Sequence, residues 1–169
     1  LMECEAIKRV KKVFGLNNVS IMVPFCRTIK EAKDVKALIQ KSGLLDSDKS
    51  SKLYVMCEIP SNVVLINEFL DIFDGMSIGS NDLTQLILGI DRDNAVIQKI
   101  GDERNEAVKK MVAEVIKVCR KRKKYVGICG QAPNDFPEFA EFLAKQGIES
   151  MSLNPDTVIK TILDLSKKK

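Results

Sequence analysis

The 169-residue sequence contains no histidine and no tryptophan, and its aromatic residues make up only 5% of the chain. Without histidine, the chain cannot itself supply a Ser-His-Asp triad or a metal site with imidazole ligands. It also lacks the run of about 20 apolar residues that a membrane-spanning helix needs. No signal peptide is recognisable in the sequence. We therefore expect a cytoplasmic protein.

Cysteine is present, but not in a disulfide pattern. The five cysteines are Cys4, Cys26, Cys57, Cys119 and Cys129. They are odd in number and irregularly spaced, and none forms a CxxC pair. This pattern indicates free thiols in a reducing compartment rather than a disulfide framework.

The remaining composition is typical of one globular domain. Hydrophobic residues make up 45% and charged residues 30% of the chain, which is long enough to bury a core. A net charge of +4 is too small to suggest nucleic-acid binding. The basic runs at 120–124 and 166–169 each close a predicted helix, where cations complement the helix dipole.

Short apolar runs alternate with segments of helical periodicity along the chain. The runs predict strands at residues 19–25, 53–59, 75–79, 125–130 and 150–154. The periodic segments predict helices at 2–14, 28–41, 61–73, 103–122 and 136–146, and a last helix beginning at Pro155. Thr28 with Glu31, and Asp135 with Glu138, have the spacing of capping boxes, and an unusually long connection follows residue 79. The alternation of near-continuous apolar strands, buried on both faces, with helices predicts a parallel α/β fold.

The residues alone are compatible with two architectures of such a fold. Five β/α units could complete an open, doubly wound flavodoxin-like sheet. They could also be part of a (β/α)8 barrel, but a whole barrel needs about 250 residues, so this alternative requires a fragment. The chain begins at Leu1 and enters a helical pattern directly, which suggests a piece of a longer protein.

Polar residues follow the predicted strands, where parallel β/α folds bind their ligands. These positions hold Pro24, Phe25, Arg27, Glu58, Asn81, Asp82, Cys129 and Asn154. Carboxylates from neighbouring strands, such as Glu58 and Asp82, suit Mg²⁺ when a phosphorylated substrate and water complete its octahedron. Glu58 stands out because it is an acid within an apparently buried run, where an unpaired carboxylate is costly.

Each of these residues also has a purely structural explanation. Asp82 could cap a helix that begins in the same segment, and Glu58 could pair with a buried Arg or Lys. Cys129, between two glycines, could be a small packing residue. Arg27 could be an ordinary solvent-facing charge.

The segment DGMSIGSNDLTQLILGIDR, residues 74–92, resembles the signature of the phosphoenolpyruvate (PEP)-utilising enzymes. This family includes phosphoenolpyruvate synthase (pyruvate, water dikinase), pyruvate phosphate dikinase and enzyme I of the sugar phosphotransferase system. Four further segments continue the likeness in the family's order: MVPFCRT, MCEIPSN, GICGQAPND and SLNPDTV. The resemblance covers essentially the whole chain and is closest to the synthase branch.

The resemblance implies that residues 1–169 are the last five β/α units, strands four to eight, of the family's C-terminal TIM barrel. The first three barrel strands, the swivelling phosphohistidine domain and the ATP-grasp domain are absent from this chain. Five strands of a barrel leave two open edges and an apolar inner face. Because such surfaces favour association, we expect a homo-oligomer.

The resemblance also assigns a metal and phosphate site. Glu58 and Asp82 match the two ligands of Mg²⁺. Asn81 matches the residue that contacts the phosphate of PEP, and the backbone of residues 79–80 (Gly79 and Ser80) lines the same pocket. Arg92 matches a phosphate-binding arginine at the end of the signature.

Cys129 matches the cysteine that moves a proton on the methylene carbon of the enolate. Gln131 lies beside it and is assigned to the substrate pocket. Ala132 stands where the family tends to have Gly, which affects the predicted shape of the loop after Cys129. Arg27 is a candidate for the rim of the site, without an assigned role.

In the implied reaction, a phosphohistidine on a mobile domain gives its phosphoryl group to the enolate oxygen of pyruvate. The intact enzyme would convert ATP, pyruvate and water to PEP, AMP and phosphate. One alternative within the family is pyruvate phosphate dikinase. Another is enzyme I, which passes the phosphoryl group to a carrier protein and has no ATP-grasp domain. An alternative of another class is a truncated or non-catalytic module, and the isolated chain is expected to be inactive because it lacks the phosphohistidine.

Overall fold

The computed structural model describes residues 2–45, 51–91, 94 and 96–167. These residues form a parallel five-stranded sheet with the order β1-β2-β3-β4-β5. The strands are β1 (Ile21–Val23), β2 (Leu53–Cys57), β3 (Gly75–Gly79), β4 (Tyr125–Cys129) and β5 (Ser150–Met151). The parallel α/β prediction is confirmed. The strictly sequential order differs from the 2-1-3-4-5 order of a flavodoxin-like sheet.

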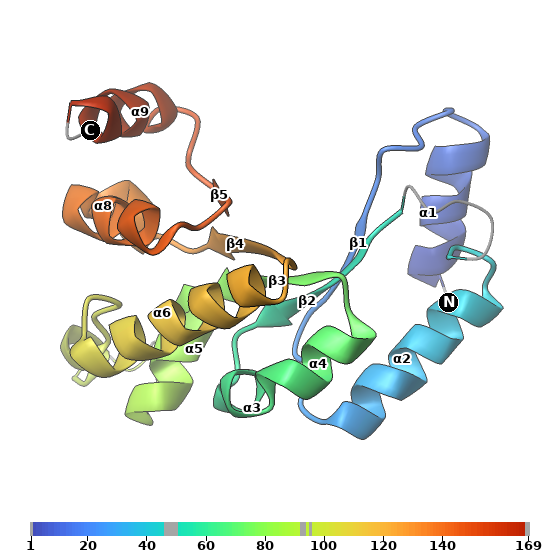
Figure 1. Ribbon diagram of the computed structural model, residues 1–169, viewed down its shortest axis with the longest axis horizontal. Coiled ribbons are helices and arrows are strands. Elements are labelled where there is room, and N and C mark those ends of the chain that lie inside the picture. The colour runs from blue at the N-terminus through green and yellow to red at the C-terminus, as the bar shows by residue number, and fades with distance from the viewer. Residues whose placement is uncertain (1, 46–50, 92–93, 95, 168–169) are drawn as a thin grey trace.

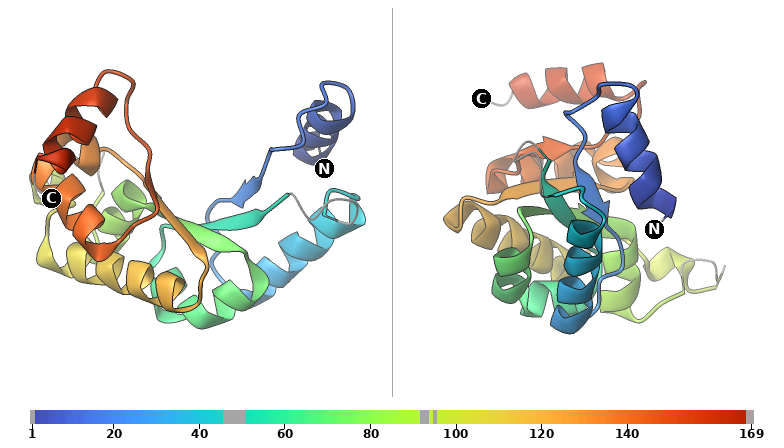
Figure 2. Two further views of the ribbon diagram at one scale, coloured as in Figure 1. Left: turned by 45° about the horizontal axis from the view of Figure 1, so that its top comes forward. Right: turned by 90° about the vertical axis from the view of Figure 1, so that its right-hand side faces the viewer.

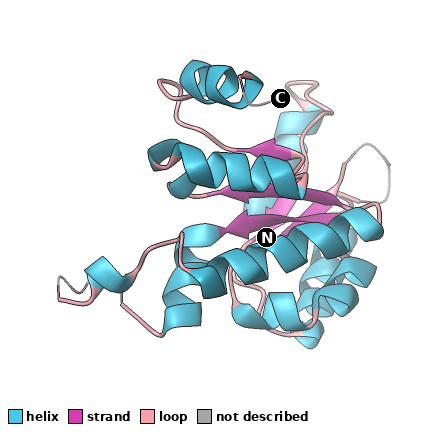
Figure 3. Cartoon of the chain, turned by 60° about the vertical axis from the view of Figure 1, so that its left-hand side comes forward, coloured by secondary structure: helices cyan, strands magenta, loops and turns pink. Residues whose placement is uncertain are grey.

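Helices follow the strands along one side of the sheet. They are α1 (Met2–Lys12), α2 (Ile29–Lys41), α3 (Pro60–Val64), α4 (Ile66–Ile72), α5 (Ser80–Leu88), the 3-10 helix η1 (Gln98–Ile100), α6 (Glu106–Lys121), α7 (Ala132–Asp135), α8 (Pro137–Gln146) and α9 (Val158–Ser166). The described chain forms an arc with α1 near one end and α9 at the other (Figures 1 and 2). The helices line its outer side, and η1 projects from the body of the molecule (Figure 3).

The two outer strands differ from the prediction. β1 is shorter than predicted and alternates in burial, with Ile21 and Val23 buried and Met22 42% exposed. The expectation of burial on both faces is therefore wrong for β1. Helices pack on only one face of this strand, so every second side chain remains accessible. β5 is likewise shorter than predicted and comprises only Ser150–Met151.

The first predicted capping box is confirmed in part. The Thr28 hydroxyl accepts a hydrogen bond of 3.1 Å from the N–H of Glu31, at the start of α2. The Glu31 carboxylate, however, accepts from the backbone N–H of Arg27, at 2.8 Å, rather than from that of Thr28. The Thr28 side chain therefore fulfils its predicted role. The Glu31 side chain instead binds the backbone of Arg27, the residue before Thr28.

The second predicted capping box is wrong. Asp135 is the last residue of α7, and α8 begins at Pro137 with Phe136 as its N-cap and no side-chain cap. Pro137 takes the first helical position and restricts the preceding residue to an extended conformation. Phe136 has φ −124° and ψ 100°, which separates the two helices.

Two other helical predictions also need correction. The predicted helix at 61–73 is interrupted at Leu65 and forms α3 and α4. The long connection predicted after residue 79 instead begins with α5, directly at the end of β3. The basic run at 120–124 does place Arg120 and Lys121 in the last turn of α6. The run at 166–169 lies partly outside the described residues.

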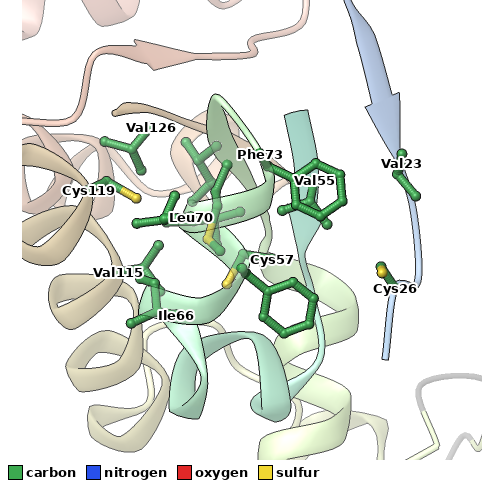
Figure 4. Packing of buried hydrophobic residues seen from close by; sticks show 14 of the residues in the cluster. Val23, Cys26, Val55, Cys57, Ile66, Leu70, Phe73, Val115, Cys119 and Val126 are labelled. Atoms are coloured by element: carbon green, nitrogen blue, oxygen red, sulfur yellow. The ribbon is translucent and has the colours of Figure 1, made fainter. Parts of the chain in front are cut away.

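The core lies between the sheet and the helices on its outer side. Figure 4 shows side chains of β2, α4 and α6 that meet there: Val55, Cys57, Ile66, Leu70, Val115 and Cys119. All five cysteines are free, as predicted, and four of them are buried. Within the part of the chain that the structure describes, no helix is long and apolar enough to cross a membrane.

Truncation of Leu70 tests this core. Leu70 lies on α4 and is fully buried, whereas Val64 at the end of α3 is 74% exposed. Leu70→Ala is expected to lower the free energy of unfolding by about 2–5 kcal/mol, because it leaves a cavity. The control Val64→Ala should change it by no more than about 0.5 kcal/mol. Urea unfolding followed by circular dichroism measures both, and equal effects would contradict the described packing.

Candidate functional site at the carboxyl ends of the strands

The carboxyl ends of β2, β3 and β4 bring three predicted residues into one row. Gly79 pairs with Cys129 between β3 and β4, and Cys57 pairs with Ile78 between β2 and β3. Glu58 directly follows Cys57 and therefore lies beside Gly79. The three strands are adjacent in the sheet (Figure 1). The sheet register thus brings Glu58, Gly79 and Cys129 together from three separate segments.

Gly79 makes room for the Glu58 side chain. A Cβ atom on Gly79 would lie 2.7 Å from Glu58 Oε2 and 2.9 Å from Cε of Met56. Both separations are too short for ordinary contacts, so a side chain at this position would displace Glu58 or Met56. A glycine inside a strand often marks such a close approach. The packing role of Gly79 was not visible in the sequence.

Glu58 is a buried carboxylate. It is 2% exposed, and its Oε1 accepts a hydrogen bond of 2.7 Å from the backbone N–H of Phe25. Burial raises the pKa of Glu58; the Phe25 N–H opposes this rise, and the charge of Asp82 adds to it. The predicted alternative, an ion pair with a buried Arg or Lys, is not found among the described residues. The second carboxylate of this region, that of Asp82, therefore acts on Glu58 without an intervening cation from the described chain.

Asn62 holds the backbone at Glu58, a role that its position in the sequence did not reveal. This buried side chain accepts hydrogen bonds from the backbone N–H groups of Glu58, at 3.3 Å, and Ile59, at 3.2 Å. Its amide donates to the carbonyl of Cys26, at 2.7 Å. Asn62 therefore joins the segment after β1 to the end of β2. The available signal was an asparagine in the first turn of a predicted helix, four residues after the acid.

The backbone of Phe25 is a second contributor that the sequence did not reveal. Phe25 has φ 47°, in the left-handed region that residues other than glycine seldom adopt. Its N–H group points to Glu58. No residue-type signal identifies such a donor, because it belongs to the main chain.

The first turn of α5 holds the next predicted residues. The helix begins at Ser80 with Gly79 as its N-cap, so Asn81 and Asp82 are its second and third residues. Asp82 is therefore not the N-cap, and the capping alternative is not supported in that form. The backbone N–H groups of a first helical turn have no partner within the helix and, together with the helix dipole, favour anions.

Cys129 is the only cysteine of the five that is not buried. Its sulfur lies 3.6 Å from Ser77 Oγ, 3.6 Å from the carbonyl oxygen of Ile78 and 3.9 Å from Met56 Sδ. Ser77 and Ile78 lie on the adjacent strand β3 and Met56 on β2 beyond it, so the thiol faces across the sheet towards β2. The partial exposure distinguishes Cys129 from the packing cysteines of the core.

The loop after Cys129 leads directly into α7. Gln131 is exposed at the N-cap of α7, and Ala132 is the fully buried first residue of that helix. A helical position does not require glycine, so alanine is accommodated at residue 132. Asn134 donates to the carbonyl of Gly130, at 3.2 Å, and accepts from the N–H of Asn154, at 2.7 Å. Asn134 thus connects this loop to the segment after β5.

Two predicted residues, Arg27 and Asn154, are not brought into this row. The Arg27 side chain is 64% exposed and pairs with Glu31 at 3.4 Å, as an ordinary surface charge would. Asn154 is exposed and takes part through its backbone N–H. Arg92 lies outside the described residues.

The donor set fits a cation that keeps much of its coordination for water and substrate. Across residues 2–45, 51–91, 94 and 96–167, no group of three or more His, Cys, Asp or Glu side chains is arranged to hold a metal. Glu58 at the end of β2 and Asp82 in the first turn of α5 supply two carboxylates at this edge of the sheet, and the charge of Asp82 contributes to the raised pKa of Glu58. Mg²⁺ is commonly bound through one or two carboxylates, with waters and substrate oxygens completing the octahedron.

Residues 1–169 match the family described as PEP-utilising enzyme, PEP-binding domain. The chain belongs to this family. It is 54% identical over 162 residues to a phosphoenolpyruvate synthase of Aquifex aeolicus, covering 96% of this chain and 19% of that protein. It is 52% identical over 168 residues to the phosphoenolpyruvate synthase of Escherichia coli, covering 99% and 21% respectively.

A more distant relative is the phosphoenolpyruvate synthase of Aeropyrum pernix, which is 44% identical over 161 residues, covering 94% of this chain and 20% of that protein. The chain therefore spans about one fifth of the length of these relatives. Membership of the PEP-utilising family confirms the resemblance that residues 74–92 and the four other segments predicted.

Thiol labelling tests the arrangement of the cysteines. Burial raises the pKa of Cys26 to about 11 and that of Cys119 to about 12, and it also raises the pKa of Cys57. At pH 8 these buried groups are protonated, and the thiolate is the reactive form. We expect iodoacetamide to modify Cys129 before these three, as measured by mass spectrometry of peptides. Equal rates in the folded chain would contradict the structure.

Proposed function

We propose that this chain is the PEP- and pyruvate-binding part of a phosphoenolpyruvate synthase. In this proposal residues 1–169 are strands four to eight of a (β/α)8 barrel, and the other barrel strands and the phosphohistidine and ATP-grasp domains belong to the intact enzyme. The sequential parallel sheet with helices on its outer side supports the barrel. So do the exposed apolar residues of the last helix, Ile159, Ile162 and Leu163.

The observation that carries the proposal is the row of Glu58, Gly79 and Cys129, continued by the first turn of α5. It combines two carboxylates, the backbone N–H groups of a first helical turn and a partly exposed thiol at one edge of the sheet. These are the groups needed to hold an anionic substrate and to move a proton on it. The resemblance between the sequence and the family assigns the same residues.

Glu58 and Asp82 would hold Mg²⁺ between them and the substrate. When bound, the metal supplies positive charge that stabilises the carboxylate and enolate oxygens of pyruvate. Burial and the nearby charge of Asp82 both disfavour an ionised Glu58 in the bare chain. A bound cation would remove this penalty, which is a physical reason for two carboxylates at this position.

The phosphate of PEP would lie at the start of α5. Asn81 would donate to it from its side chain, and the backbone of Gly79 and Ser80 would line the pocket. The positive end of the helix dipole favours a phosphate at this place. Arg92 is assigned a phosphate contact from the sequence alone. Phosphoryl transfer depends mainly on such positioning and charge neutralisation.

Cys129 would add a proton to, or remove one from, the methylene carbon of the enolate. Its partial exposure at the end of β4 supports this role. Gln131 would contribute to the same pocket from the start of α7.

In the intact enzyme, a phosphohistidine formed from ATP would supply the phosphoryl group, and PEP, AMP and phosphate would be the products. The relatives are named phosphoenolpyruvate synthases, which favours this activity over pyruvate phosphate dikinase or enzyme I. We further propose that the isolated chain is catalytically inactive and associates through its open edges and exposed apolar residues.

Replacement of Cys129 tests its catalytic role in the intact enzyme. Cys129→Ser and Cys129→Ala are expected to abolish pyruvate-dependent PEP formation but to leave the affinity for PEP within about three-fold. The reason is that the thiol moves a proton without anchoring the phosphate. Cys4→Ser, at a buried cysteine in α1, is the control and should retain turnover. Near-normal turnover in either Cys129 variant would refute the role.

Replacement of Asp82 tests the metal site. Asp82→Asn is expected to weaken Mg²⁺-dependent binding of oxalate, an analogue of the pyruvate enolate, by at least about ten-fold, because a carboxylate ligand is lost. Asp34→Asn, at an exposed residue of α2 paired with Lys30, is the control. Isothermal titration with and without Mg²⁺ measures the affinity. Unchanged affinity in Asp82→Asn would leave Asp82 with a structural role only.

A further inference from the structure

A group of buried polar side chains lies beside the site without an assigned role. Ser80, Thr84 and Glu103 are all buried, and each has an oxygen atom without a hydrogen-bond partner: Ser80 Oγ, Thr84 Oγ1 and Glu103 Oε1. Such orphan atoms are rare in folded proteins and call for an explanation. Glu103 is the most unusual of the three, since an acid is rarely buried to 7% exposure.

Glu103 lies where three segments meet. A Cβ atom on Gly130 would collide with Ser80 Oγ and would lie 3.1 Å from both Asn81 Oδ1 and Glu103 Oε1. The loop after Cys129 therefore packs directly against the first turn of α5 and against Glu103. Gly130 permits this approach because it has no side chain.

The carboxyl group of Glu103 lies close to Gly130, and so does the Ser80 hydroxyl. Burial raises the pKa of Glu103, whereas the Ser80 hydroxyl and the backbone N–H of Ala132 act to lower it. Ser80 is the first residue of α5, and Ala132 is the first residue of α7. One side chain thus faces the start of both helices that follow the site strands.

The residues on either side of Glu103 hold its backbone in place. The Arg104 guanidinium donates to both carboxylate oxygens of Asp102, at 3.0 and 2.8 Å, and to Glu138 of α8, at 3.1 Å. It also lies 3.7 Å from the centre of the Phe136 ring. Asn105 caps α6. The segment that carries Glu103 is therefore held against Phe136 and Glu138 through Arg104.

We propose that Glu103 is a positioning residue whose buried carboxyl group holds the loop of residues 130–132 against the start of α5. Cys129 directly precedes this loop, and Asn81 directly follows Ser80. The contact therefore determines the separation between the thiol and the phosphate-binding turn. Its catalytic consequence rests on the proposed function, but the contact itself does not.

The rate of Cys129 alkylation in the 169-residue chain tests this contact and requires no activity assay. Glu103→Ala removes the carboxyl group and frees the loop, so the rate of Cys129 alkylation should rise at least about five-fold through local opening. Glu103→Gln keeps the shape and an acceptor oxygen and should restore a rate within about two-fold of the original. Glu106→Ala, at an exposed acid of α6 paired with Lys109, should leave the rate unchanged.

The buried thiols Cys57 and Cys119 report on global unfolding in the same samples. Their alkylation rates should not change in Glu103→Ala. An unchanged Cys129 rate, or a parallel rise at all three cysteines, would overturn the proposal. If Glu103→Ala does not fold, Gly130→Ala replaces it, because the added methyl group pushes the loop away from Ser80 and Glu103. It should raise the Cys129 rate alone, and any other result would overturn the proposal.

Kinetics of the intact enzyme test the catalytic consequence. Glu103→Ala should lower kcat for PEP formation at least about ten-fold with KM for pyruvate within about three-fold, because the substrate contacts remain while the proton-moving group is displaced. Glu103→Gln should retain most of the activity. An unchanged kcat in Glu103→Ala, or equal losses in both variants, would overturn the positioning role. An unmodified enzyme that forms no PEP would instead refute the proposed function, and the labelling result would still decide the contact.

Discussion

The close approach of β2 and β3 at Gly79 is the constraint on which the rest of the site depends. The parallel register places Glu58 beside Gly79 and Gly79 beside Cys129, so a side chain at Gly79 would push against the carboxylate. The absence of that side chain lets Glu58 lie over the neighbouring strand. Because α5 begins immediately after Gly79, the same residue also sets where the first helical turn lies. The pairing of β3 with its neighbours, the position of the Glu58 carboxylate and the start of α5 therefore all depend on Gly79.

The electrostatics of the site follow from this crowding. Glu58 is removed from water and lies near a second carboxylate, and both conditions raise its pKa. The compensation within the described residues comes from dipoles rather than from a cation: the N–H of Phe25 donates to the carboxylate, and Asn62 orients the backbone. These dipoles do not neutralise the negative charge of two ionised carboxylates. A divalent cation with substrate oxygens would balance it.

The loops at the carboxyl ends are joined in succession by single polar side chains. Asn62 connects the segment after β1 to the end of β2. Asn134 connects the loop after β4 to the segment after β5. Glu103 lies close to Gly130, where the loop after β4 meets the start of α5. Asn62 and Glu103 are buried and Asn134 is partly buried. Polar contacts in such surroundings are specific in geometry, so they hold the loops in one arrangement, whereas apolar contacts tolerate sliding. The residues of the site are thus positioned by contacts between the loops as well as by the sheet.

The parallel α/β class, the free thiols, the family and the residues at the strand ends could all be predicted before folding was considered, because apolar periodicity and contiguous motifs are local properties. The sequence did not reveal the roles of Asn62, Phe25 and Glu103, since these depend on which segments the fold brings together. It also predicted a capping box at Asp135 and Glu138 that the backbone before Pro137 prevents. The burial of β1 was overestimated because an apolar run does not indicate whether helices cover one face or both. These features become visible only in the folded chain, because register and loop packing depend on contacts between residues far apart in the sequence.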